Sequence, residues 1–469
     1  MGLRLHRCAV LGSRQNLRQV AQLTSDWGAW DTVSLYLDRC QVDTPDTLVE
    51  ATWKHVREAR SEISKVLDFG AGDGRFAKYG IFDEYIGFEI DEDRCRGSEL
   101  PINARLVNQC AFHENLDDAD LCIGNPPFVR NQDLPEGWRQ HASNVLKKRT
   151  GLTLSGLSNA WQYFFLLSLI SCKTDGLVAL VIPYEWVSRP SARNLRVYIR
   201  EQGWSVKVYR LVDTTFDSVL TTSSITIVDK SSRTGTWQFF EESRDGTWAQ
   251  KISESGAAAG VIPYRRRSEM RANAPRAVRG LSPGTQKVLT LTEAERARCG
   301  LEISIDVVPC VTTLRALPAD QTSFGEDQFR VLFRDAGQKC WLIRTDTPPS
   351  RNLAAYLSCV PAADYQTATC LEREVWWKFN MPPVPDVLMA QSFKGTYPKA
   401  VVNSVRARAV GGVCGVYNLE PAQAALVSTG LNGIDIRERV VAHSHGLRKI
   451  EINQINALLD DAFVDGQFV

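Results

Sequence analysis

The sequence predicts an α/β protein, with a Rossmann-like domain built on a mostly parallel sheet, a connector, and a mixed α+β domain. From about residue 66, short β-rich runs alternate with helical stretches, a pattern typical of parallel sheets covered by helices. A glycine-rich turn follows the first of these runs. At 469 residues, the chain is long enough for two or three domains with cores of their own. We expect the parts to be residues 1–230, 231–300 and 301–469.

The expected strands of the first domain are short runs rich in Val, Ile, Leu, Phe and Tyr, and Gly, Pro or acidic residues bound most of them. In chain order they are Val66–Phe69, Tyr85–Asp91, Ala119–Ile123, Leu177–Ile182, Val206–Leu211 and Ser223–Val228, with a helix over Ser191–Gln202. The last two strands follow each other closely and are expected to close the sheet as a pair. The first domain therefore ends near residue 230.

The remaining sequence changes character twice. Residues 231–300 lose the alternation and gain Gly, Ser, Ala and charge, which is typical of a connector, and Gly256–Gly260 is its most linker-like piece. From residue 301 onward, apolar pieces separated by Pro and Gly predict irregular β structure mixed with helices.

Composition argues against several classes of protein. The hydrophobic fraction of 44% is that of a soluble globular chain, and the most apolar run, Trp161–Ile170, is about half the length that a membrane-spanning helix needs. The 12 cysteines contain no CxxC pair, which favours a reduced, cytoplasmic interior over a disulfide framework. None of the 6 histidines is spaced with a cysteine as zinc ligands are, so no metal site is expected.

The turn Gly70–Gly74 predicts a cofactor site. Glycines between a strand and a helix let the backbone approach a ligand closely, and an acid at the end of the next strand can accept hydrogen bonds from ribose hydroxyls. Glu89 lies 21 residues after Asp68 and has this position. The glycines alone also fit a dinucleotide, but Asp68 would repel a pyrophosphate and can pair with an α-amino group. S-adenosylmethionine is therefore favoured, with Asp68, Gly70, Gly72 and Glu89 as contacts.

The tetrapeptide Asn125-Pro126-Pro127-Phe128 predicts a pocket for the amino group of a nucleic-acid base. The Asn125 side-chain oxygen and the Pro126 carbonyl are two acceptors, and a planar amine offers two donors. Hydrogen bonds to both protons would raise electron density on the nitrogen, which is otherwise a poor nucleophile. Phe128 supplies a stacking face for a base extruded from a helix. The sequence thus favours methylation of a base amino group, with Asn125, Pro126 and Phe128 as catalytic residues.

The segments Asp68–Gly72, Gly87–Asp91 and Gly124–Arg130 together resemble the TaqI-type, γ-class DNA adenine-N6 methyltransferases of bacterial restriction-modification systems. The resemblance is specific over residues 40–230 and looser beyond them. It implies a class I methyltransferase domain with a mostly parallel seven-stranded sheet, S-adenosylmethionine as cofactor, and a C-terminal target-recognition domain. The implied substrate is N6 of a flipped adenine in double-stranded DNA.

The same resemblance implies roles for further residues. Gln41–Pro45 is similar to the family's N-terminal cofactor motif, which puts Thr44 at the methionine end of the cofactor, and Asn125 would also contact the cofactor. Phe216 lies where the family has a second aromatic residue, so that Phe128 and Phe216 would enclose the flipped base. Each stacking contact would contribute about 1–3 kcal/mol.

The chain departs from the family at Asn108–Phe112. Cys110 stands at the expected position of the aspartate that contacts the cofactor adenine. Cofactor affinity, or the identity of the contacting residue, is open at this point. Gln109 is the alternative to Cys110, and Phe112 is expected to pack near the adenine.

Two basic stretches predict contacts with DNA phosphates. Residues 261–279 contain six arginines and one acidic residue. Residues 387–419 contain no acidic residue and follow the aromatic stretch Trp376–Asn380. The expected DNA-contacting residues are Arg130, Arg265, Arg266, Arg267, Lys394, Lys399, Arg406 and Arg408.

Three functions stay open. The first is a DNA adenine-N6 methyltransferase whose partner is double-stranded DNA. The second is an RNA-base or protein-glutamine methyltransferase, because the same tetrapeptide can present other amino groups. The third is a non-catalytic DNA-binding subunit, suggested by Cys110. No acid-acid-x-lysine nuclease site is apparent, so any cognate restriction endonuclease is expected to be a separate protein, and this chain a monomer.

Overall fold

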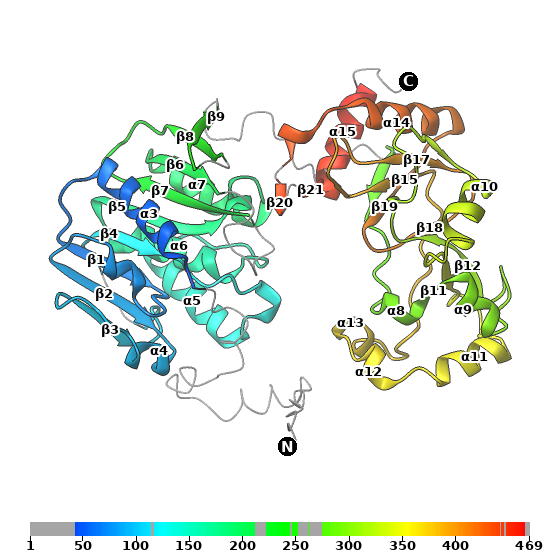
Figure 1. Cartoon of the computed structure of the whole chain (residues 1–469), viewed down its shortest axis with the longest axis horizontal. Helices are drawn as coiled ribbons and strands as arrows, with labels where there is room; N and C mark the ends of the chain where they lie inside the picture. Colours follow the sequence, from blue (N-terminus) through cyan, green and yellow to red (C-terminus); the bar gives the residue numbers. More distant parts are fainter. Residues whose placement is uncertain are drawn as a thin grey trace. The chain divides into compact units, whose positions relative to one another are not determined.

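The computed structural model describes residues 43–113, 117–211, 222–243, 246–251, 262, 274–440, 442–444 and 447–464. The chain divides into two compact units, residues 1–259 and 260–469 (Figure 1). The candidate catalytic motifs all lie in the first unit.

A nine-stranded sheet organises the first unit, in the order β3-β2-β1-β4-β5-β7-β6-β8-β9 (Figure 1). Neighbours from β3 through β5 are parallel, and β7 is antiparallel between β5 and β6. The strands are β1 Lys65–Phe69, β2 Glu84–Glu89, β3 Ala104–Asn108, β4 Ala119–Gly124, β5 Cys172–Pro183, β6 Ser205–Arg210, β7 Ser223–Asp229, β8 Trp237–Glu242 and β9 Trp248–Lys251. The predicted α/β fold with a mostly parallel sheet is confirmed, but the sheet has nine strands where the resemblance implied seven, because β8 and β9 extend its edge.

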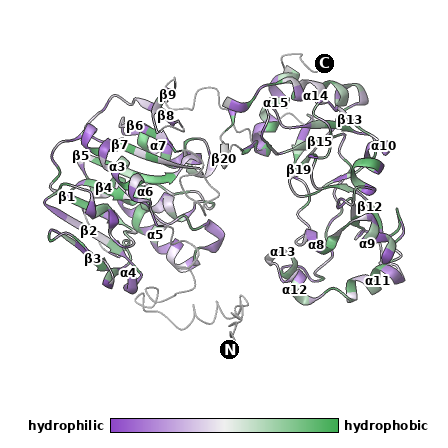
Figure 2. Ribbon diagram, in the orientation of Figure 1, coloured by the Kyte–Doolittle hydropathy of each residue, from purple (hydrophilic) through white to green (hydrophobic). Residues whose placement is uncertain are grey.

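Helices cover both faces of this sheet. Successive strand residues point to opposite sides, and the apolar ones on each side pack against helices. Val66 and Leu177 pack with α3, whereas Leu67 and Val178 pack with α5, α6 and α7. The helical elements are α3 Asp46–Ala59, η3 Arg75–Lys78, α4 Glu92–Arg96, η4 Asn131–Asp133, α5 Glu136–Thr150, α6 Ala160–Ser171, η5 Tyr184–Val187, η6 Pro190–Ala192 and α7 Arg193–Glu201. Figure 2 shows the central strands mostly in green, as two-sided burial requires.

The apolar run noted in the sequence lies within α6, where Trp161 and Phe165 are buried in the core. The helix is apolar all round because it packs on the sheet with one side and on α5 with another. Among the described residues, no helix combines the length and apolarity needed to cross a membrane.

The sheet continues past residue 230, where the sequence predicted a connector. β8 pairs in parallel with β6, so that Val206 lies opposite Trp237, and β9 pairs with β8. Trp237 and Phe239 are buried against the main core, which explains why this edge folds onto the sheet. The division between the two compact units falls between residues 259 and 260.

The second unit is mixed α+β. Its sheets have the orders β10-β19-β15-β17-β13, β11-β14-β12-β18 and β16-β21-β20. Its strands are β10 Arg276–Val278, β11 Thr290–Leu291, β12 Val307–Val311, β13 Ser323–Phe324, β14 Trp341–Ile343, β15 Val387–Ala390, β16 Ser392–Phe393, β17 Ala400–Asn403, β18 Arg408–Ala409, β19 Val413–Tyr417, β20 Ala442–Ser444 and β21 Leu447–Lys449.

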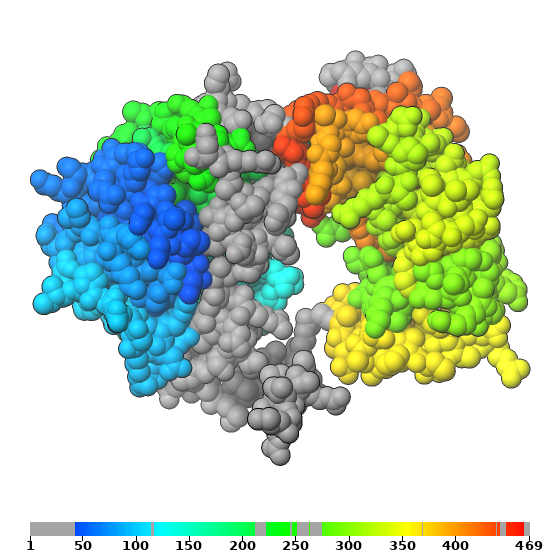
Figure 3. All heavy atoms as spheres, viewed as in Figure 1, coloured from blue at the N-terminus to red at the C-terminus, as the bar shows by residue number. Residues whose placement is uncertain are grey.

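The helices of the second unit are α8 Gln286–Leu289, α9 Glu293–Arg298, α10 Glu326–Phe329, η8 Arg330–Arg334, α11 Arg351–Ser358, α12 Ala362–Tyr365, α13 Ala368–Leu371, α14 Pro421–Gly433, η9 Arg437–Arg439 and α15 Ile452–Val464. Leu431 of α14 and Leu459 of α15 share a core with Val387 of the five-stranded sheet. The unit therefore has a hydrophobic core of its own here, and a second one around the four-stranded sheet. Figure 3 shows the orange and red residues of this region at the surface of the unit.

Candidate active site

The candidate active site lies where β1, β2 and β4 end. These three strands are parallel neighbours, so their carboxyl ends meet at one edge of the sheet. β1 leads into the glycine turn, β2 ends at Glu89, and β4 ends at Gly124, immediately before Asn125. Strand order therefore brings together three motifs that are far apart in the sequence.

A pocket opens at this edge of the first unit. It is lined by Asp43, Thr44, Gly70, Ala71, Gly72, Asp73, Arg75, Phe76, Phe88, Glu89, Ile90, Arg94, Gln109, Cys110, Ala111, Asn125, Pro127, Val129, Leu134, Pro135, Trp138, Ala160 and Phe164. The predicted cofactor residues Thr44, Gly70, Gly72, Glu89, Cys110 and Asn125 are among them. Asp68, Phe112, Pro126 and Phe128 do not line it.

The glycine turn and the Asn125 loop are in contact. Gly70, Gly72 and Gly74 have φ values of +87°, +60° and +71°, which residues with a Cβ rarely adopt. A Cβ on Gly70 would lie 3.1 Å from Cδ of Pro127. The positive φ angles and this close approach explain why glycines occupy the turn.

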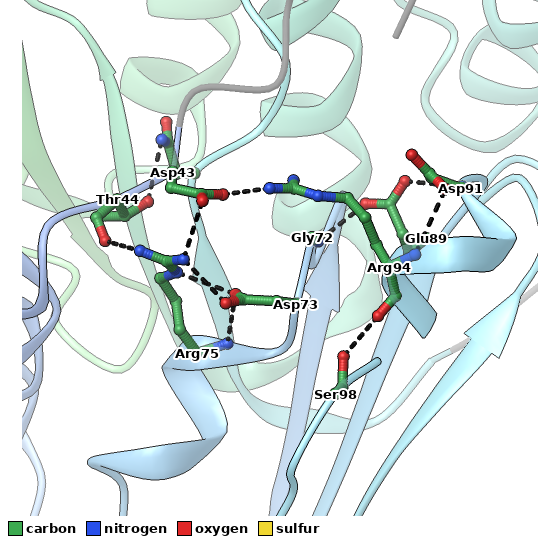
Figure 4. A network of polar contacts seen from close by, with 10 residues as sticks. Asp43, Thr44, Gly72, Asp73, Arg75, Glu89, Asp91, Arg94 and Ser98 are labelled. Carbon is green, nitrogen blue, oxygen red and sulfur yellow. Dashed lines mark hydrogen bonds and ion pairs between the residues drawn. The ribbon is translucent and has the colours of Figure 1, made fainter. Parts of the chain in front are cut away.

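Glu89 is held in the pocket wall by backbone donors. Its Oε2 accepts a hydrogen bond from the Gly72 N–H at 2.8 Å, and its Oε1 accepts one from the Asp91 N–H at 2.9 Å (Figure 4). The side chain is buried, and burial raises the pKa of Glu89. The carboxylate thus has a fixed orientation at the end of β2, as expected for a ribose acceptor.

Asn125 shows an asymmetric pattern of hydrogen bonds. Its Nδ2 donates to Oγ1 of Thr44 at 3.0 Å. Its Oδ1 is buried and has no hydrogen-bond partner among the described residues. A buried acceptor without a partner costs about 1–3 kcal/mol, and a ligand that donates a hydrogen bond to it would remove this cost. The free acceptor is the atom that the sequence predicted to receive an amino proton.

The sequence predicted that Asp68 contacts the cofactor by pairing with its α-amino group. In the structure, Asp68 instead lies beneath the Asn125 loop and does not line the pocket. Its side chain is fully buried, and the Tyr85 hydroxyl donates to its Oδ2 at 2.6 Å. Burial raises the pKa of Asp68 to about 7, although the Tyr85 hydrogen bond opposes this shift. Gly124 lies directly against this carboxyl group, since a Cβ there would overlap Oδ1 of Asp68.

The buried Asp68 predicts a pH-dependent effect on stability. Between about pH 4 and pH 7 the folded protein keeps a proton on Asp68 that the unfolded chain releases, so this group destabilises the fold as the pH rises. An asparagine cannot ionise, so Asp68→Asn avoids this loss. The difference in the free energy of unfolding between Asp68→Asn and the wild type should therefore be more favourable to the variant at pH 8 than at pH 5, by up to about 3 kcal/mol. Denaturant unfolding at both pH values measures this difference. The exposed Asp83→Asn is the control, and an equal effect of Asp68→Asn at both pH values would contradict the expectation.

The contact between Gly124 and Asp68 predicts a strong effect of one methyl group. Gly124→Ala would place Cβ inside the Asp68 carboxyl group at a φ of +150°, so we expect a loss of about 1–3 kcal/mol of stability and displacement of the Asn125 loop. Thermal unfolding measures the loss. Gly156→Ala is the matched control, because no described atom lies within 4 Å of its added Cβ. Equal melting temperatures for the two variants would contradict this reasoning.

A network of charged residues joins the glycine turn to the segment before α3 (Figure 4). Arg75 donates to both carboxylate oxygens of Asp73, at 2.9 and 2.8 Å, and to the Thr44 carbonyl at 2.5 Å. Asp43 lies between two cations: it is 3.2 Å from Arg75 and also pairs with Arg94. These charged residues were not among those predicted from the sequence, where their signal is the pair of opposite charges, Asp73 and Arg75, at the end of the glycine turn.

Aromatic residues that the sequence reasoning missed form another part of the pocket wall. Trp138 of α5 and Phe164 of α6 line the pocket. Phe112 is buried behind them, with ring centroids 5.3 Å from Trp138 and 5.2 Å from Phe164. Gln109 and Cys110 both line the pocket, so the structure keeps both as candidates for the adenine contact.

Two further predicted residues, Phe128 and Arg130, are not among the residues that line the pocket. Phe128 is half-buried against the main core, and Arg130 is exposed and pairs with Asp133 at 2.8 Å. Phe216 lies outside the described residues, as do Arg265, Arg266 and Arg267. Their proposed contacts with the base and DNA stay predictions.

The basic residues of the second unit lie in different surroundings. Lys394 is exposed, whereas Lys399 donates to the Pro318 carbonyl. Arg406 is exposed at a φ of +59°, just before β18. Arg408 on β18 is near enough to Arg406 for their charges to interact, and partial burial lowers its pKa. Arg406 and Arg408 are thus the pair that the structure brings together.

No group of three or more His, Cys, Asp or Glu side chains in the described part of the chain is arranged to hold a metal ion. The polar groups that line the pocket are amides, carboxylates, guanidinium groups, a hydroxyl and backbone atoms, set among apolar side chains.

Comparisons with known proteins match both units. A family model described as Eco57I restriction-modification methylase matches residues 82–217, which include Glu89 and the Asn125 loop. The type II methyltransferase M.XamI of Xanthomonas campestris pv. amaranthicola is 24% identical over 459 residues, covering 89% of this chain and 84% of the relative. The predicted resemblance to restriction-modification methylases is therefore confirmed.

Other matches cover less of this chain. The defense against restriction protein B of Escherichia phage P1 is 24% identical over 218 residues, which are 45% of this chain, and the match spans only 9% of the phage protein. The methyltransferase subunit of a type I restriction-modification system from Streptococcus thermophilus has 18% identity and a TM-score of 0.37, covering 48% of this chain and 55% of that structure.

Proposed function

We propose that the protein is a γ-class DNA adenine-N6 methyltransferase of a restriction-modification system, with S-adenosylmethionine as its cofactor. The observation that carries this proposal is the buried Oδ1 of Asn125, which has no partner among the described residues and lies at a pocket with cofactor-binding features. The similarity to M.XamI and to the Eco57I model supports DNA as the substrate and restriction-modification as the setting.

The residues of the pocket suit S-adenosylmethionine. Glu89 offers a fixed carboxylate for ribose hydroxyls, and the glycine turn leaves backbone open to the ligand. Ile90, Leu134 and Trp138 supply an apolar wall for an adenine ring. When bound, the cofactor supplies an electrophilic methyl group.

The role of the protein in the reaction is to hold the acceptor amine. Oδ1 of Asn125 would accept one amino proton, which increases the electron density on the nitrogen as it becomes tetrahedral. The Pro126 carbonyl as acceptor of the other proton stays a prediction from the sequence, since Pro126 does not line the pocket. Because Nδ2 of Asn125 is held by Thr44, the carboxamide is oriented before the substrate binds. No covalent intermediate is needed.

A direct assay tests the function. Purified protein is incubated with S-adenosylmethionine carrying a labelled methyl group and with duplex DNA of diverse sequence, and the DNA is then digested to nucleosides. Labelled N6-methyladenine is the expected product. Transfer only to RNA or to protein would reject DNA as the substrate, and failure of the cofactor to bind in calorimetry would instead favour a non-catalytic DNA-binding subunit.

A further inference from the structure

The orientation of the Asn125 carboxamide depends on a residue 81 positions earlier in the chain. The two ends of a carboxamide have nearly the same shape, but only the oxygen accepts a hydrogen bond. In the structure, Oγ1 of Thr44 lies 3.0 Å from Nδ2 of Asn125. With Nδ2 paired in this way, Oδ1 is the end left without a partner among the described residues.

Thr44 is itself held in place. Its side chain is buried, and its carbonyl accepts a hydrogen bond from Arg75 at 2.5 Å. Arg75 also binds both oxygens of Asp73 in the glycine turn (Figure 4). Together with the bond from Asn125 to Thr44, these contacts form one connected series from the glycine turn to Asn125. Pro45 follows Thr44, and its carbonyl accepts from the Leu48 and Val49 N–H groups in the first turn of α3. The hydroxyl therefore has little freedom to move away from Asn125.

We infer that Thr44 is a positioning residue for Asn125. Its hydroxyl oxygen holds the Nδ2 end of the carboxamide and thereby directs Oδ1 toward the amino group of the substrate. This role rests on the proposed function and differs from a contact with the cofactor, because it acts on the rate of transfer after the cofactor is bound. Arg75 supports it by fixing the Thr44 backbone.

The test compares two substitutions that separate shape from hydrogen bonding. Thr44→Val keeps the size of the side chain but removes the acceptor, and Thr44→Ser keeps the hydroxyl. With saturating cofactor and DNA, Thr44→Val should lower the single-turnover rate of methyl transfer by about 10- to 100-fold, since a misplaced catalytic group costs about this much. Thr44→Ser should restore most of the rate.

Calorimetry with S-adenosylmethionine separates positioning from cofactor binding. The inference predicts that the loss in Thr44→Val persists at saturating cofactor, whatever the change in the dissociation constant. A Thr44→Val protein that binds the cofactor more weakly but transfers at the wild-type rate when saturated would overturn it.

A spectroscopic measurement applies even if no methyl transfer is found. The Asn125 side-chain amide signal of protein labelled with ¹⁵N-asparagine is assigned by its loss in Asn125→Ala. In the wild type its amide protons should show a nuclear Overhauser contact with the Thr44 side chain. The signal should also shift in Thr44→Val and return in Thr44→Ser.

The two failures are thus distinguishable. Absence of the Overhauser contact, or an unshifted Asn125 signal in Thr44→Val, would overturn the positioning role. Lack of transfer to DNA by the wild-type protein, with the contact present, would overturn only the proposed function.

Discussion

Replacing Asn125 with alanine is expected to lower the rate of methyl transfer by about 100- to 1000-fold, while the affinity for S-adenosylmethionine changes by less than about threefold. The reason is that Oδ1 of Asn125 has no partner among the described residues and is available to the substrate amine, whose nitrogen gains from this hydrogen bond as it becomes tetrahedral. Single-turnover transfer to duplex DNA measures the rate, and calorimetry measures the affinity.

Two further variants make the Asn125 experiment specific. Asn125→Asp keeps an oxygen acceptor of the same shape and should retain more transfer than Asn125→Ala. Asn144→Ala, on the exposed side of α5, removes an asparagine of the same unit that lies away from the pocket, and should leave transfer unchanged. Equal losses of transfer and cofactor affinity in Asn125→Ala would contradict the assignment and favour a structural role for this side chain.

The strands that carry the motifs were predictable because helices on both faces of the sheet bury them, which requires apolar runs. β1, β2 and β4 are short, mostly apolar runs with clear ends. β5 is longer, and only its buried part from Leu177 was predicted, because Lys173 and Asp175 make its start polar. β3 was missed because Arg105 and Asn108 interrupt a run that is only partly buried at the sheet edge. β8 was missed because only Trp237 and Phe239 are buried in it, and it lies after residue 230, where the sequence predicted the end of the sheet.

The composition of the site was predictable, but the direction of its side chains was not. The types of residue in Asp68–Gly72 and Asn125–Phe128 predict a cofactor turn and an amine acceptor. That Asp68 faces Gly124 and Tyr85 depends on packing between β1, β2 and β4, which no local pattern encodes. The same holds for Arg75, whose partner Thr44 is 31 residues away.

The contacts also explain why these motifs act together. Gly70 approaches Pro127 and Gly124 approaches Asp68, so each loop occupies space that only a glycine on the other leaves open. A side chain added at either glycine would therefore press on the facing segment, more strongly at Gly124, where Cβ would overlap the Asp68 carboxyl group, than at Gly70, where it would lie 3.1 Å from Pro127. Substitutions of these two glycines should be assayed both for cofactor binding and for methyl transfer.

Replacing Glu89 with alanine should weaken the binding of S-adenosylmethionine by about 100-fold or more, while leaving the transfer rate at saturating cofactor nearly unchanged. Two effects combine: the ribose loses its acceptor, and the N–H groups of Gly72 and Asp91 lose theirs, each charged hydrogen bond contributing about 1.5–3 kcal/mol. Glu89→Gln should also weaken binding, because its amide end would face one of these N–H donors. Glu84→Ala, at the exposed start of the same strand, is the matched control. Calorimetry that finds equal affinities for the wild type, Glu84→Ala and Glu89→Ala would show that the ribose is held elsewhere and that the acid at the end of β2 only supports the glycine turn.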